Sequence, residues 1–155
     1  MYYTAGMNKE PLGKWISIIY RYSMMHANKF LKDYGINAGQ LPFFMNIVKN
    51  PGITQEELSK ILKIDKSTTA KAVKILCQKG YLTKQTSKED KRVYKLFPTE
   101  KAKNIEEAII RKAFEWDRDI LLNNLNKDEK EHAYKLLSHI ANNCIKYFEK
   151  GDKCE

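Results

Sequence analysis

The stretch that most constrains the fold of this chain is residues 54–92, because short-range signals there set where helices begin and end. Thr54 is followed three residues later by Glu57, the spacing of a capping box, so a helix is predicted to begin there. Asp65 can cap a second helix, and Gly80 can end it in a left-handed conformation. Two short helices joined by a tight turn indicate a helix-turn-helix.

The second of these helices has two chemically different faces. Ala70, Val73, Leu76 and Cys77 recur at helical spacing and are predicted to pack inward. The other face carries short hydroxyl groups and lysines, which suit a close approach to phosphates and base edges. An ordinary surface helix with solvated lysines is the alternative. The predicted DNA-contacting residues of the helix are Lys66, Ser67, Thr68, Thr69, Lys71 and Lys74.

A β-hairpin is predicted directly after this helix. The segments 82–86 and 93–97 are strand-like, and the residues between them are too polar to be buried. Such a hairpin is a wing, whose basic tip can lie over the DNA backbone or in the minor groove, where Arg is favoured. An ion pair between Asp90 and Arg92 that stiffens the hairpin is the alternative, and both roles are compatible. The predicted wing contacts are Lys88, Asp90, Lys91 and Arg92.

The order TQEELSKIL, IDKSTTAKAVKILCQKGYL and a wing with Asp90-Lys91-Arg92 resembles the multiple antibiotic resistance regulator (MarR) family. INAGQLPFF and the long helices at both ends also resemble that family, so the resemblance covers nearly the whole chain. The segment Phe97-Pro98-Thr99-Glu100-Lys101-Ala102 stands where the family usually has Leu-Thr followed by Gly, although Thr99 is retained. The resemblance implies a mainly α fold with a small β-hairpin wing.

The resemblance also implies an organisation of the chain in three parts. These are an N-terminal dimerisation helix (1–36), a winged helix-turn-helix DNA-binding domain (37–98) and C-terminal dimerisation helices (99–155). The end helices carry apolar stripes and project beyond a small head, so they need another surface, which a second copy supplies by two-fold symmetry. Antiparallel packing within one chain is the alternative. The candidate interface residues are Trp15, Ile16, Leu136, Ile140 and Phe148.

Further local signals place the ends of these helices. Asn126 and Glu129 form a second capping-box pair, which predicts the start of the last helix. The helix before it is predicted to run from near Ala102 to about Leu125. Pro42 falls within the first turns of a predicted helix and is expected to bend it slightly.

The charge of the chain is unevenly distributed. The chain has 28 Lys and Arg against 19 Asp and Glu, a net charge of +9. Residues 54–92 hold ten basic and five acidic residues, residues 1–53 hold six and two, and residues 93–155 hold twelve of each. The positive field therefore belongs to the first part of the chain and to the predicted DNA-reading segment, as phosphate binding requires.

The cysteine content and the hydropathy indicate a cytoplasmic protein. Cys77, Cys144 and Cys154 are odd in number and widely spaced, which fits a reducing compartment better than a disulfide framework. The first residues lack the apolar core of a secretory signal, and no apolar run approaches membrane-spanning length. We expect no membrane partner.

The resemblance implies a transcriptional repressor that binds double-stranded DNA as a homodimer. The two DNA-binding heads of the dimer change their spacing when a small aromatic or anionic effector binds. For the aromatic residues and Met25 in the predicted effector crevice, plain core packing is the favoured alternative. A redox-responsive regulator is a rival within the family, but its members carry a reactive cysteine on the first helix, where this chain has none. The candidate effector-binding residues are Arg21, Tyr22, Met25, His26, Phe43 and Phe44.

The sequence gives little support for an enzyme. The histidines His26, His132 and His139 lie in no metal-binding motif, although Glu129 with the last two is a loose arrangement of ligand types. No glycine-rich phosphate loop is present. We therefore predict no catalytic residues, no metal and no cofactor. A winged helix that binds protein rather than DNA is the stronger alternative.

Overall fold

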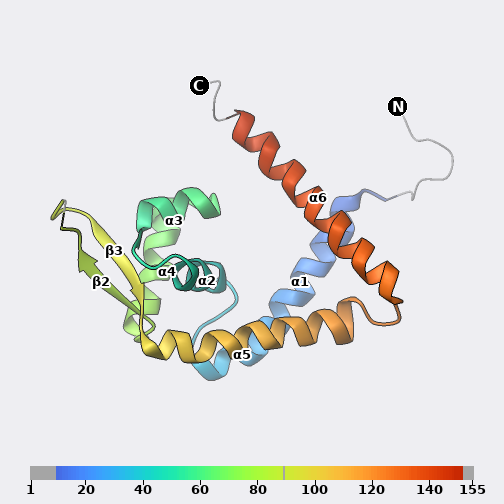
Figure 1. Ribbon diagram of the computed structural model, residues 1–155, viewed down its shortest axis with the longest axis horizontal. Coiled ribbons are helices and arrows are strands. Elements are labelled where there is room, and N and C mark those ends of the chain that lie inside the picture. The colour runs from blue at the N-terminus through green and yellow to red at the C-terminus, as the bar shows by residue number, and fades with distance from the viewer. Residues whose placement is uncertain (1–9, 89, 152–155) are drawn as a thin grey trace. The chain divides into compact units, whose positions relative to one another are not determined.

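The computed structural model describes residues 10–88 and 90–151, which form two compact units, one up to Trp116 and one from Asp117 onward. Helices dominate both units, and the small sheet lies in the first (Figure 1), which confirms the predicted fold class. In chain order the elements are α1 (Leu12–Leu31), η1 (Lys32–Tyr34), α2 (Leu41–Lys49), β1 (Ile53–Thr54), α3 (Gln55–Leu62), α4 (Lys66–Gln78), β2 (Leu82–Thr86), β3 (Tyr94–Pro98), α5 (Glu100–Trp116), η2 (Asp117–Leu121) and α6 (Lys127–Gly151).

The sheet consists of the predicted hairpin and one further short strand. The order is β1-β3-β2, with both pairs antiparallel. Strand β2 has its predicted bounds, whereas β3 starts one residue later than predicted, because Tyr94 is the first residue to pair, opposite Thr86. Strand β1 was not predicted. Its Ile53 pairs with Leu96, and this contact anchors the wing to the segment that leads into α3.

One hydrophobic core holds the first unit together. It gathers buried side chains from every α-helix of that unit and from all three strands. Leu31 of α1 and Ala102 and Ile109 of α5 belong to it, so the two long helices share the core of the winged head. Asn28 of α1 also accepts the backbone N–H of Ala38 at 2.8 Å, which fixes the segment before α2. The division into 1–36, 37–98 and 99–155 therefore stays a prediction about which parts bind DNA and which form a dimer. It does not correspond to separately packed parts of the first unit.

The helix bounds bear on two predictions, and one of them was wrong. Pro42 occupies the first turn of α2, which begins at Leu41, and an N–H there has no helical partner to lose, so the slight bend stays a prediction. The helix predicted to reach Leu125 ends as an α-helix at Trp116, and a π-helical turn, η2, follows.

The second unit consists of η2 and α6. The predicted capping box of α6 is confirmed, because Asn126 N–H donates to the Glu129 carboxylate at 2.8 Å and Glu129 N–H donates to Asn126 Oδ1 at 3.0 Å. Tyr134 Oη donates to Asp117 Oδ2 at 3.2 Å and ties α6 to η2. Among the residues described, no helix combines the length and the apolar character that crossing a membrane requires.

Candidate nucleic-acid interface

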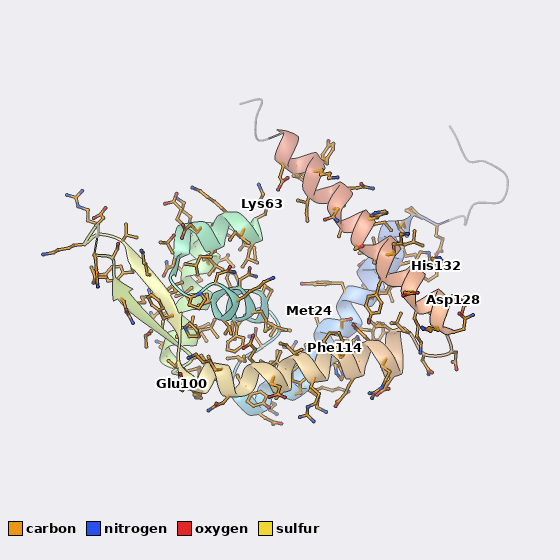
Figure 2. All side chains as sticks on the ribbon, viewed as in Figure 1. Met24, Lys63, Glu100, Phe114, Asp128 and His132 are labelled. Carbon is orange, nitrogen blue, oxygen red and sulfur yellow. The ribbon has the colours of Figure 1, made fainter. Side chains whose placement is uncertain are left out.

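Local capping fixes both helices of the helix-turn-helix. At α3, Thr54 Oγ1 accepts the Glu57 N–H at 3.2 Å and the Glu57 carboxylate accepts the Thr54 N–H at 2.8 Å, so the predicted capping box is confirmed. Lys63, visible at the end of α3 in Figure 2, takes a left-handed conformation with φ 52°. This residue lets the chain reverse in a tight turn before α4.

Asp65 begins the recognition helix α4. Its carboxylate accepts the Thr68 N–H at 2.8 Å, and this hydrogen bond holds the pKa of Asp65 below its ordinary value. At the other end, Gly80 has φ 75°, and the N–H groups of Gly80 and Tyr81 bond to the carbonyls of Cys77 and Leu76 at 2.9 Å. This is a Schellman motif, so both predicted ends of the helix are confirmed.

The two faces of α4 separate as the sequence indicates, with one exception. Val73 and Leu76 are fully buried, and Ala70 and Cys77 are half-buried. Thr69 was predicted to contact DNA, but it is 0 % exposed and its Oγ1 donates to the Asp65 carbonyl at 3.0 Å. It is a core residue and leaves the candidate set. The remaining predicted residues on α4 are all exposed: Lys66, Ser67, Thr68, Lys71 and Lys74.

The wing tip is an exposed turn held by backbone hydrogen bonds. Ser87 N–H donates to the Val93 carbonyl at 2.8 Å, and Val93 N–H donates to the Asp90 carbonyl at 3.0 Å. Asp90 Oδ1 accepts the backbone N–H of Arg92 at 2.9 Å, so this carboxylate shapes the turn that presents Arg92. Lys88, Asp90, Lys91 and Arg92 are all exposed.

A further contact braces the wing against the first helix of the motif. Lys84 Nζ of β2 donates to Gln55 Oε1 at the start of α3, at 2.9 Å. Together with the pairing of β1 and β3, it sets the direction of the hairpin, which extends away from the helices to a free tip (Figure 1). The exposed face of α4 and the wing tip thus belong to the same unit, and these contacts connect the hairpin to the helices. We use the term reading face for the exposed residues of α4 and the wing tip together: Lys66, Ser67, Thr68, Lys71, Lys74, Lys88, Asp90, Lys91 and Arg92.

Sequence reasoning missed an acidic residue beside this face. Glu56 of α3 approaches Lys60 at 3.3 Å and Lys66 at 3.5 Å, both through Oε1. The pair with Lys60 follows the four-residue spacing of helical ion pairs and could have been found from sequence. The pair with Lys66 crosses the turn between two helices, so no spacing rule indicates it.

The candidate effector residues lie in different environments. Arg21, Tyr22 and Met25 are exposed on α1. Phe43 and Phe44 were candidates for an effector crevice, but they are 2 % and 0 % exposed, in agreement with the favoured alternative of core packing. They face the core because α2 turns this side towards the rest of the head, and they leave the candidate set.

His26 is the most distinctive member of that set. It is half-buried and stacks on Trp116 of α5, with ring centroids 4.3 Å apart and planes at 18°. Its Nε2 is buried and has no hydrogen-bond partner among the described residues. Trp116 in turn donates through Nε1 to Ser23 Oγ at 3.0 Å.

The described residues include two cysteines, Cys77 and Cys144, neither of them in a disulfide. Cys77 is half-buried in α4, and burial raises the pKa of its thiol, which opposes thiolate formation, although the charge of Lys84 acts the other way. Cys144 is exposed on α6. Cys154 lies outside the described residues.

Comparisons with known proteins agree with this geometry. A family model described as the MarR family matches residues 34–93. The HTH-type transcriptional regulator YybA of Bacillus subtilis (strain 168) is 34% identical over 130 residues, which are 82% of this chain and 86% of YybA. The crystal structure of a MarR transcriptional regulator from Methanosarcina mazei Go1 has a TM-score of 0.82 and 38% identity, covering 88% of this chain and 97% of its own.

A third relative was solved together with DNA. It is a MarR family transcriptional regulator from Listeria monocytogenes in complex with a 26mer DNA, with a TM-score of 0.77 and 30% identity. The match covers 92% of this chain and 96% of that one. The identity and coverage of these relatives exceed what a shared fold alone would give. The chain therefore belongs to the MarR family of DNA-binding transcriptional regulators.

Proposed function

We propose that this regulator is a repressor that binds a pseudo-palindromic operator as a homodimer and releases it when a small effector binds. The observation that carries the DNA-binding part is the reading face. Five exposed hydroxyl and lysine side chains on α4 and a basic wing tip share one braced unit. The helix supplies contacts to base edges and phosphates, and the wing supplies further contacts to the backbone or minor groove.

Exposed apolar side chains support the homodimer. On α1, Trp15 and Ile16 are each 42% exposed, and on α6, Leu136 and Phe148 are 60% and 64% exposed, while Ile140 is half-buried. A two-fold dimer buries each such patch twice. Two recognition helices about 34 Å apart then enter successive major grooves, and the operator is a near-palindrome.

The effector part of the proposal rests on α1. Arg21 offers an exposed cation, and His26 offers a stacked ring with an unpartnered buried nitrogen, a combination that suits an anionic aromatic molecule. Such a molecule acts only by binding one spacing of the two heads better than the other. Screening anionic aromatics for release of labelled operator tests this part.

The experiment for DNA binding is site selection from a random duplex pool, followed by a salt titration of the selected site. We expect a two-fold symmetric site whose affinity falls steeply with salt. Lys71→Ala and Arg92→Ala should each weaken binding and, where phosphate contacts are lost, reduce the salt slope by about one. Lys103→Ala and Arg111→Ala, which remove the same charges from α5, are the matched controls and should have little effect.

Unchanged operator affinity in both reading-face variants would remove the assignment of these residues. Salt-insensitive binding of a protein partner, with no contribution from Lys71 or Arg92, would instead establish a protein-binding winged helix.

A further inference from the structure

A negative charge lies beside the reading face, in contact with one of its lysines, Lys66. Glu56 lies in the first turn of α3, and one of its oxygens is within 3.5 Å of both the Lys60 and the Lys66 ammonium groups. All three side chains are exposed, at 58%, 73% and 78% for Glu56, Lys60 and Lys66. The pKa of Glu56 is held below its ordinary value, mainly by its hydrogen bond and charge interaction with Lys60 and then by those with Lys66. Glu56 is therefore an anion at neutral pH.

If DNA docks on the proposed reading face, this carboxylate lies where its phosphates approach. In a helix-turn-helix, the first helix crosses the DNA backbone and the start of the second enters the major groove. Glu56 sits in the first turn of the first helix, and Lys66 is the first residue of the second. A phosphate that binds Lys66 must therefore displace or face the carboxylate, which repels it.

We propose that Glu56 sets the affinity of this protein for DNA by acting as an internal counter-charge. It occupies Lys66 and Lys60 in the free protein and weakens the electrostatic, sequence-independent part of binding. This inference rests on the proposed reading face, because a counter-charge has this effect only where phosphates bind. Its sign is specific: a carboxylate that merely oriented Lys66 for DNA would strengthen binding, not weaken it.

The test compares the full-length protein with its Glu56→Gln variant on a labelled duplex of mixed sequence, over a series of salt concentrations. We expect Glu56→Gln to bind several-fold more tightly at about 0.1 M salt, with a slope steeper by up to about one unit. Glu107→Gln removes the same charge from an exposed position on α5 and should match the wild type. Thermal unfolding confirms that each variant is folded.

The outcomes separate this inference from the proposed function. A wild-type protein that binds no duplex would overturn the reading face itself. A wild type that binds through Lys71, with Glu56→Gln equal or weaker in affinity, would overturn only the role of Glu56.

A double-mutant cycle tests the path through Lys66. In a Lys66→Gln background, the gain from Glu56→Gln should shrink, because the lysine that it frees is absent. An equal gain in both backgrounds would overturn the pairing with Lys66 as the cause.

Discussion

Tyr81 links the end of the recognition helix to both long helices of the first unit. It is 1% exposed, and its hydroxyl donates to the Tyr34 carbonyl in η1, directly after α1, at 2.7 Å. The Lys101 ammonium of α5 lies 4.4 Å from the centre of its ring, and Phe44 meets the ring edge-on at 5.8 Å. One side chain therefore ties α4 to the segments that carry the head.

Removing the Tyr81 hydroxyl should lower the free energy of unfolding. Tyr81→Phe keeps the ring and its packing but leaves the Tyr34 carbonyl without this donor, which costs about 1–2 kcal/mol. Tyr94→Phe, at a ring that is 53% exposed, should be nearly neutral. Urea denaturation of both variants provides the measurement, and equal losses would contradict the importance of the buried hydrogen bond.

The same hydroxyl should contribute to alkaline unfolding. Burial, and then the charge of Tyr34, raise the pKa of Tyr81, so the folded protein keeps the proton that the unfolded chain releases near pH 10. The contribution is complete below the unfolded pKa and is lost as pH rises through the folded pKa. Stability should therefore fall less steeply above about pH 10 in Tyr81→Phe than in the wild type.

At this scale the sequence predicts exposure well for Lys and poorly for Thr. Lys66, Lys71 and Lys74 are exposed because a buried ammonium group needs a partner. Thr69 satisfies its hydroxyl on the carbonyl four residues earlier, so it can be buried without cost to hydrogen bonding, and its residue type does not reveal its face.

Helix ends were predictable because capping is local. Thr54, Asp65, Gly80 and the Asn126 box all act on backbone groups within a few residues of themselves, so the sequence contains the whole interaction. Strand β1 is the opposite case. Two residues form a strand there only because β3 pairs with them, and that pairing depends on where β3 lies after the chain returns from the wing tip.

The cap of the recognition helix should be sensitive to acid. The pKa of Asp65 is lowered by the Thr68 N–H, so its stabilising effect is present above the unfolded pKa of about 3.9 and is lost as pH falls through the folded pKa. Asp65→Asn retains a capping oxygen that does not titrate. The melting temperature should therefore fall less in this variant than in the wild type between about pH 5 and about pH 2. If the melting temperatures of both proteins fell equally with pH, the charge of the Asp65 carboxylate would not contribute to the cap.

At the scale of the whole molecule, the contacts between segments far apart in the sequence could not be predicted from the spacing of apolar residues. Lys84 and Gln55 are 29 residues apart, and Trp116 and Ser23 are 93 apart, and neither pair belongs to a recognisable motif. Such pairs fix the direction of the wing and the contact of α5 with α1. The family resemblance predicted the architecture, but the side chains that brace it emerged only from the structure.

At the scale of the whole molecule, exposed apolar side chains on α6 are the strongest reason to expect that a second chain packs against this one. Tyr134, Leu136, Leu137, Ile145 and Phe148 of α6 are each at least half exposed. So many exposed large apolar side chains on one helix are unusual in a soluble monomer, so a second surface is expected to cover part of them. Because a two-fold interface contains each residue twice, one substitution there places two charges in the interface.

Leu136→Glu should therefore convert a dimer to a monomer in sedimentation experiments, while the head keeps its fold. Two buried carboxylates without partners are costly, and losing the partner also removes the second recognition helix from the operator. Binding to a full operator should fall far more than binding to an isolated half-site. Ser138→Glu adds the same charge on α6, away from the predicted stripe, and should remain dimeric. A Leu136→Glu protein that stays dimeric and binds the operator normally would show that α6 does not form the interface.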